Sequence, residues 1–304
     1  MIYTVTFNPA VDYVVYTSEM AIGEINRARD ENVFFGGKGV NVSLILNELG
    51  VRSKALGFVA GFTGAAIENS LREKGIETDF VHLKNGISRI NVKIKSGINA
   101  YLETELNGKG PDVSEDSLEE LCKKLDVLAD GDTLVLAGSI PESMPTDIYQ
   151  KILERMSGKN IRTIVDARRD LLLNVLKYKP YMVKPNHHEL GEIFGVTLRT
   201  TDGITEYALK LKEKGARNVL VSMAGDGALL LDESGNTHIC RACRGIVNNS
   251  VGAGDSLMAG FIAGLDEKGD IDYAMKLGTA AGGATAFSHG LATRDEIFDL
   301  LKEL

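Results

Sequence analysis

The segment Asn249–Met258 places two glycines and a carboxylate at the start of a predicted helix. Gly252 and Gly254 free the backbone to turn successive N–H groups toward one point, and the positive end of the helix dipole strengthens their attraction for an anion. Asp255 would stand beside that anion, where a carboxylate is useful if it accepts a proton from an attacking hydroxyl. The pattern favours phosphoryl transfer, although an ordinary glycine-rich helix start explains this segment alone equally well.

A second anion-binding helix start is predicted at residues 36–41, which read Gly-Gly-Lys-Gly-Val-Asn. Lys38 and Asn41 add side-chain donors to the exposed backbone N–H groups, which suits a sugar or a phosphate. A Walker loop is excluded because Gly39 stands where Ser or Thr must bind magnesium. A dinucleotide fingerprint is excluded as well, since Leu257 occupies the position of its third glycine.

Residues 184–189, Lys-Pro-Asn-His-His-Glu, follow an apolar run and open another predicted helix. Asn186 and Glu189 lie three residues apart on one helical face, where the Glu189 carboxylate could hold a magnesium ion through water. A helix N-cap with Glu at the third helical position explains the same pair without any ligand. We expect His187 and His188 to be structural or surface residues, because adjacent helical residues point about 100° apart.

Residues 222–228 end an apolar run and turn through Gly225 and Gly227. Such a turn at a sheet edge lets a flat base or ribose lie against the backbone, and a plain hairpin is the alternative. Cys240 and Cys243 have the spacing of redox and metal motifs, but one pair supplies only two of the four ligands of a structural zinc site. We therefore expect no metal or redox role for these cysteines.

Short apolar runs alternate with helical patterns from about residue 130 onward, which predicts a parallel sheet covered on both faces. The runs are Thr133–Ala137, Thr163–Asp166, Tyr181–Val183 and Asn218–Ser222. Earlier in the chain, a helix is predicted from Gly39 to Leu49 and is ended by Gly50. The expected fold class is α/β, with a doubly wound, mostly parallel sheet and helices on both faces.

Two regions, about 10–35 and 87–107, show short β-rich patterns without intervening helices. Their runs are Asp12–Tyr16, Asn32–Phe35, Arg89–Lys95 and Ala100–Glu105. We expect these runs to form a small antiparallel sheet, inserted in a single domain that spans residues 1–304. Over the carboxyl ends of the main strands this sheet would act as a lid, and an edge extension of the main sheet is the alternative.

The chain carries 34 basic and 42 acidic residues, and its net charge of −8 argues against nonspecific binding to nucleic acid or to an anionic membrane. Residues 1–7 lack the basic flank and cleavage site of a signal peptide and predict a first strand instead. The three cysteines form no disulfide framework and fit a reducing compartment. We therefore expect a cytoplasmic protein without a membrane partner.

Together these segments resemble the ribokinase-like phosphofructokinase B family of sugar kinases over nearly the whole chain. Residues 36–39 and 251–256 are similar to the two signatures of that family. The resemblance implies a ribokinase-like fold with a β-sheet lid. It also implies transfer of a phosphoryl group from ATP, with Mg²⁺, to a hydroxyl of a sugar phosphate. Family members often dimerise through the lid sheet, so a homodimer is expected.

The resemblance also assigns roles to individual residues. The expected catalytic residues are Asp255, as the base, and Gly252, Ala253 and Gly254, whose backbone N–H groups form an anion hole. The expected ligands of the sugar phosphate are Asp12, Arg27, Gly37, Lys38, Asn41, Arg89 and Ser139. The expected residues on the nucleotide side are Lys184, Asn186, Glu189, Ser222, Gly225, Gly227 and Asn249, with Glu189 also holding Mg²⁺ through water.

Five segments look most like those of family members that phosphorylate D-fructose 1-phosphate at its 6-hydroxyl. These segments are residues 8–13, 89–93, 136–141, 184–192 and 221–229. Tagatose 6-phosphate is an alternative substrate with the same chemistry, and fructose 6-phosphate is a more distant one. A catalytically silent sugar-phosphate sensor would be a different class of protein, and the presence of Asp255 argues against it, because a pure binder needs no base.

Overall fold

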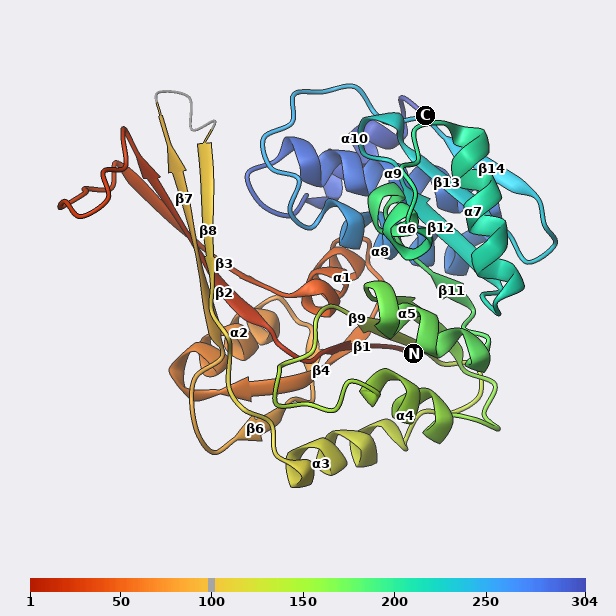
Figure 1. Cartoon of the computed structure of the whole chain (residues 1–304), viewed down its shortest axis with the longest axis horizontal. Helices are drawn as coiled ribbons and strands as arrows, with labels where there is room; N and C mark the ends of the chain where they lie inside the picture. The colour runs from red at the N-terminus through yellow and green to blue at the C-terminus, as the bar shows by residue number, and fades with distance from the viewer. Residues whose placement is uncertain (98–101) are drawn as a thin grey trace.

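The computed structural model describes residues 1–97 and 102–304 and shows an α/β body from which a smaller sheet extends (Figure 1). The strands of the body are β1 (Ile2–Thr6), β4 (Ser53–Ala60), β5 (Glu77–Thr78), β6 (Val81–Leu83), β9 (Thr133–Ala137), β10 (Arg162–Asp166), β11 (Met182–Val183), β12 (Asn218–Ser222), β13 (Ala228–Leu231) and β14 (Thr237–Cys240). Their order is β14-β13-β12-β11-β10-β9-β1-β4-β5, and β6 also pairs with β4. Neighbours from β12 to β5 are parallel, whereas β13 and β14 add an antiparallel edge.

The central strands are buried on both faces because successive side chains point to opposite layers of helices. In β9, for example, Leu134 and Leu136 join one core while Val135 and Ala137 join the other. The first core is covered by α3 (Glu115–Leu125), α4 (Ile148–Arg155), α5 (Arg169–Val175), α6 (His187–Phe194) and α7 (Thr201–Glu213). The second core is covered by α1 (Lys38–Glu48), α8 (Ala253–Lys268), α9 (Ile271–Phe287) and α10 (Arg294–Leu301), and α2 (Gly61–Glu73) packs in a third cluster with β4. The predicted α/β class with helices on both faces is confirmed.

Several elements have the predicted bounds. β9 and β12 coincide with the predicted apolar runs, and α1 begins one residue before its predicted start. Gly50 follows the C-cap of α1 with a φ of 76°, the left-handed conformation that ends a helix most easily at glycine. Within residues 1–97 and 102–304, no helix is both long enough and apolar enough to cross a membrane.

The smaller sheet, which we call the lid, contains β2 (Ala10–Thr17), β3 (Asp30–Gly36), β7 (Arg89–Ser96) and β8 (Leu102–Asn107) in the order β3-β2-β7-β8. The pairs β2–β3 and β7–β8 are antiparallel, but the central pair β2–β7 is parallel. The prediction of a wholly antiparallel sheet is therefore wrong. The chain leaves β3 for the body and re-enters the lid only at β7, and such a long crossover permits a parallel pair. Ala100 and Tyr101, predicted as part of the last strand, lie outside the described residues.

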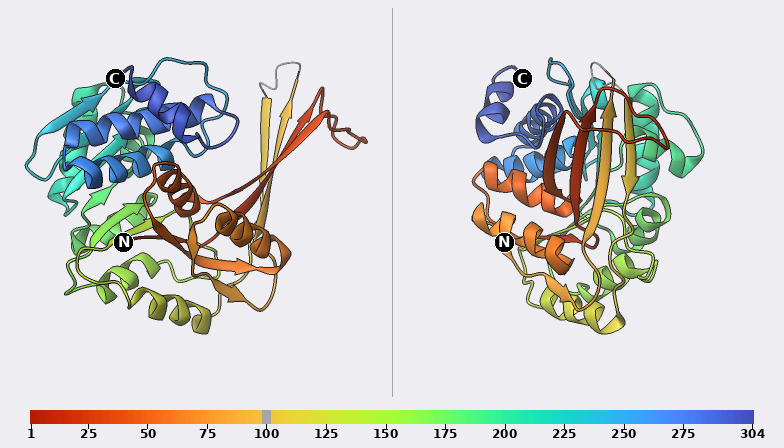
Figure 2. Two further views of the ribbon diagram at one scale, coloured as in Figure 1. Left: turned by 180° about the vertical axis from the view of Figure 1, so that it is seen from behind. Right: turned by 90° about the vertical axis from the view of Figure 1, so that its left-hand side faces the viewer.

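The two faces of the lid differ in polarity. By register, Val33, Tyr13, Val92 and Leu106 form one row across all four strands on the outer face, and Leu106 is 71% exposed. The inner face carries polar rows. One row is Phe34, Asp12, Asn91 and Asn107, and the next is Asn32, Val14, Lys93 and Glu105. Figure 2 shows the lid standing away from the body in one view and facing the viewer in the other.

Candidate active site

A pocket of about 1040 Å³ lies between the inner face of the lid and the carboxyl ends of the main strands. Its walls combine the ends of β10 and β12 with the first turns of α1, α6 and α8. Parallel strands bring their carboxyl ends to one edge of the sheet, so segments far apart in the sequence meet here. Of the predicted site residues, all but Arg27, Ser139 and Asn249 line this pocket.

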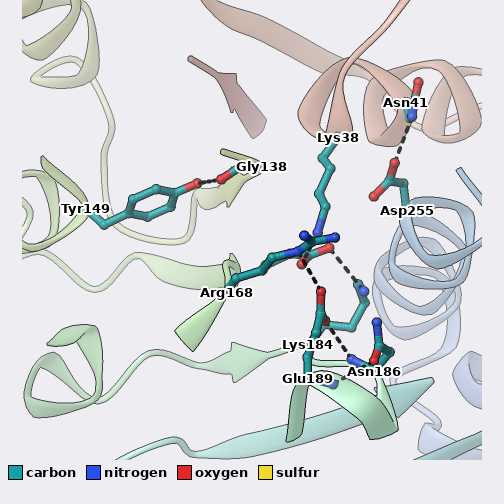
Figure 3. A network of polar contacts seen from close by, with 10 residues as sticks. Lys38, Asn41, Gly138, Tyr149, Arg168, Lys184, Asn186, Glu189 and Asp255 are labelled. Atoms are coloured by element: carbon teal, nitrogen blue, oxygen red, sulfur yellow. Dashed lines mark hydrogen bonds and ion pairs between the residues drawn. The ribbon is translucent and has the colours of Figure 1, made fainter. Parts of the chain in front are cut away.

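Asp255 lies in the first turn of α8 and is only 6% exposed. Its Oδ2 accepts a hydrogen bond of 2.7 Å from the Asn41 side-chain amide, which projects from the first turn of α1 (Figure 3). Burial, followed by repulsion from the Asp166 carboxylate, raises the pKa of Asp255 to about 6, against the opposing effects of Lys38, Asn41 and Lys184. A carboxylate with this pKa is ionised at neutral pH and is a stronger proton acceptor than an ordinary Asp.

Asp166 links two lysines beneath the pocket. It closes β10, is 0% exposed, and contacts Lys38 Nζ at 2.6 Å through Oδ1 and Lys184 Nζ at 3.1 Å through Oδ2. Burial alone would raise the pKa of Asp166, but the charges of Lys184 and Lys38 hold it below its ordinary value. Asp166 therefore remains charged and fixes one ammonium group from α1 and one from the segment after β11.

The start of α8 presents backbone donors to the pocket. Gly252 is the N-cap residue, with a φ of 82° that a side chain would strain. The Ser256 N–H donates to the Gly252 carbonyl at 2.8 Å, the first bond of the helical i to i−4 series, made by the fourth residue of α8. The N–H groups of Gly254 and Asp255 come before that bond and have no acceptor within the helix.

A cation lies beside these donors. The Lys184 ammonium would be 3.2 Å from a Cβ placed on Gly254, so it is close to the first turn of α8. The Ala253 N–H donates a long bond of 3.3 Å to the Ser250 carbonyl, so it is the one predicted anion-hole donor that is already engaged. Backbone N–H groups and a lysine thus converge next to Asp255, as a site for a phosphoryl group requires.

The first turn of α6 is held by a capping box. Asn186 Oδ1 accepts from the Glu189 N–H at 2.8 Å, and Glu189 Oε2 accepts from the Asn186 N–H at 2.9 Å. The Arg168 guanidinium donates to Glu189 Oε1 at 3.1 Å. The capping explanation of this pair is therefore confirmed, and the same carboxylate lines the pocket.

The residues present fit a magnesium ion that is bound together with a nucleotide. In the described parts of the chain, no group of three His, Cys, Asp or Glu side chains is arranged to bind a metal. Mg²⁺ is usually held by one or two carboxylates together with water and substrate phosphates rather than by a cage of protein ligands. Each oxygen of Glu189 has a second lone pair available for a water molecule, so Glu189 can take this role through water.

The turn after β12 forms the far wall of the pocket. A short 3₁₀ helix, η2 (Ala224–Asp226), connects β12 to the antiparallel β13, so the segment is a hairpin as well as a pocket wall. Gly227 has a φ of 95°, and a Cβ there would lie 2.1 Å from the Cys240 carbonyl oxygen. Gly227 is therefore restricted to glycine, whereas a Cβ on Gly225 would meet no atom within 4 Å; both residues line the pocket with Ser222.

The opposite wall is formed by the lid and the start of α1. Asp12 Oδ1 accepts a bond of 2.7 Å from the Asn91 side chain, and the Arg89 Nε donates to the Asn8 carbonyl at 3.1 Å. Gly37 has a φ of 122°, and a Cβ there would lie 2.7 Å from the Thr6 methyl group, so only glycine fits. Positive groups and oriented acceptors therefore share this side of the pocket.

Three predicted residues lie elsewhere. Arg27 is exposed in the loop of residues 18–29, which lies at the outer end of the lid (Figure 1). Ser139 follows β9 and is exposed. Asn249 lines a neighbouring hollow of about 400 Å³, and its Oδ1 accepts from the Val251 N–H at 3.0 Å.

Comparison with known proteins identifies the family. A family model described as pfkB family carbohydrate kinase matches residues 5–297. This chain belongs to the pfkB family of carbohydrate kinases. A 1-phosphofructokinase of Bacillus subtilis (strain 168) is 46% identical over 304 residues, which cover 100% of this chain and 98% of that protein. A D-tagatose-1-phosphate kinase of Bacillus licheniformis is 39% identical over 292 residues, which cover 96% of this chain and 94% of that protein.

A solved structure agrees with the fold of this pfkB kinase. The structure of phosphofructokinase-2 from Escherichia coli in complex with substrates and products has a TM-score of 0.92 with 26% sequence identity, and it covers 100% of this chain and 99% of that one. The structure of a ribokinase from Thermotoga maritima has a TM-score of 0.81 with 20% sequence identity and covers 99% of each chain, so the ribokinase-like fold implied by the resemblance is confirmed. The lid and the body described above belong to that fold.

Sequence reasoning missed Asp166, Arg168 and the two histidines as pocket residues of this pfkB kinase. The apolar run predicts Asp166 only as the end of a strand, yet a charged residue that closes an apolar strand at the ligand-binding edge is a usable signal. His187 is half-buried and His188 is exposed, which agrees with the expectation of structural or surface residues, and both line the pocket with their ring centres 3.9 Å apart. No sequence pattern marked them, because their position follows from the fold of α6 against β12.

Proposed function

We propose that this pfkB kinase transfers the γ-phosphoryl group of ATP to the 6-hydroxyl of D-fructose 1-phosphate. The observation that carries the proposal is the position of Asp255, a buried carboxylate with a pKa of about 6 in the same helical turn as the backbone donors. A binding protein has no need of such a base beside an anion site. The similarity to the Bacillus subtilis 1-phosphofructokinase supports the choice of substrate.

In the proposed reaction Asp255 accepts the proton of the 6-hydroxyl as that oxygen attacks the γ-phosphorus. A bond forms between the sugar oxygen and phosphorus, and the bond from phosphorus to the β–γ bridging oxygen breaks, with its electron pair leaving on ADP. Asn41 holds Oδ2 of the carboxylate at 2.7 Å and so orients Asp255. The proton, the phosphoryl group and the leaving group are all accounted for by ATP, the sugar phosphate and Asp255.

Charge on the transferring group is stabilised by donors that are in place before the reaction. The N–H groups of Gly252 and Gly254 and the Lys184 ammonium would contact this group, and the Ala253 N–H would join them by exchanging its long bond to Ser250. Mg²⁺, when bound with ATP, supplies further positive charge on the phosphates. Glu189 would hold it through water.

The inner face of the lid and the start of α1 are proposed to hold the sugar phosphate. Asp12, oriented by Asn91, would accept hydrogen bonds from sugar hydroxyls, while Lys38 and Arg89 would contact the 1-phosphate. Charge-assisted hydrogen bonds of this kind contribute roughly 1.5–3 kcal/mol each, enough to favour a phosphorylated sugar over a free one. Arg27 lies outside the pocket, so its proposed contact requires closure of the lid or a second copy of the chain.

A second substrate has support from a specific relative. The Bacillus licheniformis protein is named D-tagatose-1-phosphate kinase, and D-tagatose differs from D-fructose only in configuration at carbon 4. Both sugars would place a 1-phosphate near Arg89 and a 6-hydroxyl near Asp255. Tagatose 6-phosphate, the alternative suggested by the sequence, has its 6-hydroxyl already esterified and would require the opposite orientation.

The test is ADP release with Mg-ATP and each of five sugars: fructose 1-phosphate, tagatose 1-phosphate, tagatose 6-phosphate, fructose 6-phosphate and unphosphorylated fructose. We expect fructose 1-phosphate to have the highest kcat/KM and to yield fructose 1,6-bisphosphate. A higher value for either tagatose phosphate would keep the mechanism and reject the substrate. Binding of these sugars without turnover would favour a sensor and reject the enzyme.

We further propose that a second copy of the chain covers the outer face of the lid. The row Val33, Tyr13, Val92 and Leu106 is apolar, and soluble monomers rarely expose large apolar patches. Leu106→Glu should convert a dimer to a monomer in light scattering after size-exclusion chromatography. A wild-type protein that is monomeric at micromolar concentration would reject the proposal.

A further inference from the structure

A chain of buried hydroxyl groups ends on the carbonyl of Gly252. The Ala292 N–H contacts Thr285 Oγ1 at 3.1 Å, Thr285 Oγ1 contacts Ser256 Oγ at 2.8 Å, and Ser256 Oγ contacts the Gly252 carbonyl oxygen at 2.9 Å. Ser256 and Thr285 are both 0% exposed. Ser256 is on α8, Thr285 is on α9, and Ala292 lies in the loop between α9 and α10.

The direction of every hydrogen bond in this chain is determined by its two ends. Ala292 can only donate through its N–H, and the Gly252 carbonyl can only accept. Ser256 must therefore donate its proton to Gly252 and accept one from Thr285, which in turn accepts from Ala292. Each hydroxyl both donates and accepts, and such chains are cooperative in a dry interior.

The buried polar pair Ser256 and Thr285 differs from the rest of the contact between α8 and α9. Elsewhere α8 and α9 pack through glycines and apolar side chains: a Cβ on Gly260 would lie 2.8 Å from the Gly278 Cα, and Leu257 lies against Gly278. Packing alone therefore does not call for hydroxyl groups, and burying them is costly unless each is paired. Ser256 and Thr285 are better explained by the Gly252 carbonyl, to which their hydroxyl groups lead.

The chain of hydroxyl groups holds the carbonyl of Gly252, which is one half of a peptide unit at the proposed anion hole. The carbonyl of Gly252 and the N–H of Ala253 belong to one planar peptide, so fixing the carbonyl direction also fixes the direction of that N–H. Gly252 is left-handed, with a φ of 82°, and glycine offers little resistance of its own to rotation of this peptide. The helical bond from the Ser256 N–H holds this carbonyl at 2.8 Å, and the Ser256 hydroxyl adds a second bond at 2.9 Å that links the carbonyl to α9 through Thr285.

We propose that Ser256 and Thr285 are positioning residues that orient the Gly252–Ala253 peptide of the anion hole. Neither side chain contacts the transferring phosphoryl group; both act through the Gly252 carbonyl. The inference rests on the proposed function, because it assigns the peptide a role in phosphoryl transfer. Loss of this chain of hydroxyl groups should lower kcat and leave the KM values for sugar phosphate and ATP nearly unchanged, since the aligned donors matter most in the transition state.

The experiment compares Thr285→Val, which removes the hydroxyl at nearly constant volume, with Thr285→Ser, which keeps it. Thr285→Val should lower kcat by about 10- to 100-fold, less than the ~10²–10³-fold lost when a donor is removed outright. Thr285→Ser should keep kcat within about threefold of the wild-type value. The double variant Ser256→Ala, Thr285→Val should have a kcat no lower than that of the slower single variant, because the effects of residues that act as a unit are not additive.

A matched control is available in the body of the protein. Thr4 Oγ1 and Ser43 Oγ are 2.7 Å apart and equally buried, and neither residue lines the pocket. Thr4→Val should lower the thermal midpoint by a similar amount to Thr285→Val but leave kcat unchanged. If the two variants lose stability alike and both keep wild-type kcat, the Ser256–Thr285 pair is structural and the proposal is overturned.

A second measurement does not depend on turnover. Hydrogen exchange of backbone amides in residues 250–256 should accelerate by about tenfold or more in Thr285→Val, with little change in the rest of α8. Unchanged exchange in this segment would overturn the proposal even if kcat falls. If wild-type protein turns over none of the sugar phosphates, the proposed function fails, while the exchange measurement still decides whether the chain holds the Gly252–Ala253 peptide.

Discussion

Asp166→Asn is expected to shift the acid limb of the kcat profile to lower pH. The base must be ionised to accept a proton, so kcat falls about tenfold for each pH unit below the pKa of Asp255. In the wild type this pKa is about 6, and repulsion from Asp166 is the largest cause after burial. The substitution removes that repulsion and also leaves the charges of Lys38 and Lys184 less neutralised. Both effects lower the pKa of Asp255.

The burial of Asp255, which Asp166→Asn does not change, limits how far the pKa of Asp255 can fall. Burial persists, so the pKa of Asp255 should stay above its ordinary value of 3.8 and below 6. A shift of about one unit, or ~1.4 kcal/mol, lies in the middle of that range. At pH 5 the ionised fraction would then rise from about one tenth to about one half, so activity relative to the plateau should be about fivefold greater than in the wild type.

The assay is kcat at saturating substrates from pH 4.5 to 8, with a second variant as control. Lys38→Met removes a charge that lowers the pKa of Asp255, so its acid limb should move upward. The phosphate of the substrate also titrates near pH 6. Loss of Lys38 would raise the pKa of the bound phosphate too, whereas Asp166→Asn keeps both proposed phosphate ligands, so the downward shift in Asp166→Asn is the result that identifies the protein group. Asp166→Asn breaks a buried ion pair at a cost of about 3–5 kcal/mol, and its folding must be checked by circular dichroism. Unchanged limbs in both variants, or shifts of the same sign, would refute the assignment of Asp255 as the base.

Three further predictions concern the base, the sugar phosphate and the stability of the sheet edge. Asp255→Asn should lower kcat by about 10²–10⁴-fold with nearly unchanged dissociation constants, and near-normal turnover by a folded variant would contradict its role. Arg89→Ala should raise the KM for fructose 1-phosphate by about 10- to 100-fold, the loss of one charge-assisted bond, whereas an effect confined to ATP would reject its placement. His238 contacts Asp232 and Asp272 at 3.0 Å each, and although partial burial opposes it, these contacts raise the pKa of His238. The stability that protonated His238 contributes is therefore fully present below about pH 6.5 and is lost as pH rises through its raised pKa. In denaturant unfolding, the free energies of unfolding of wild type and His238→Gln should converge above that pKa. A difference that grows with pH would contradict this sign.

The glycine-rich segments could be predicted because their local backbone requirements are visible in the sequence. Gly37 and Gly252 both have positive φ at the starts of helices, and a side chain at Gly37 would meet Thr6. A glycine before an amphipathic pattern is a local signal, so both helix starts were found. The parallel order of the main sheet followed in the same way from continuous apolar runs such as Thr133–Ala137.

Contacts made across the fold could not be predicted in this way. Asp166 meets Lys38 because β10 ends and α1 begins at the same edge of the sheet, although 128 positions separate the two residues in the sequence. The parallel pairing of β2 with β7 depends on how the chain returns from the body to the lid, which no strand pattern encodes. Local patterns find elements and anion-binding turns, whereas the electrostatics of Asp255 depend on which elements the topology brings together.

Glu189 shows that a local explanation and a functional one need not compete. The sequence suggested either an N-cap partner or a magnesium ligand, and the structure shows the complete capping box with Asn186. The same capping bonds hold the carboxylate against the pocket wall, where Arg168 contacts its other oxygen at 3.1 Å. A carboxylate fixed by a helix start loses little conformational entropy when it binds a hydrated ion, so the cap prepares the site that it also stabilises. The alternatives looked exclusive only because spacing within one helix carries no information about what the helix faces.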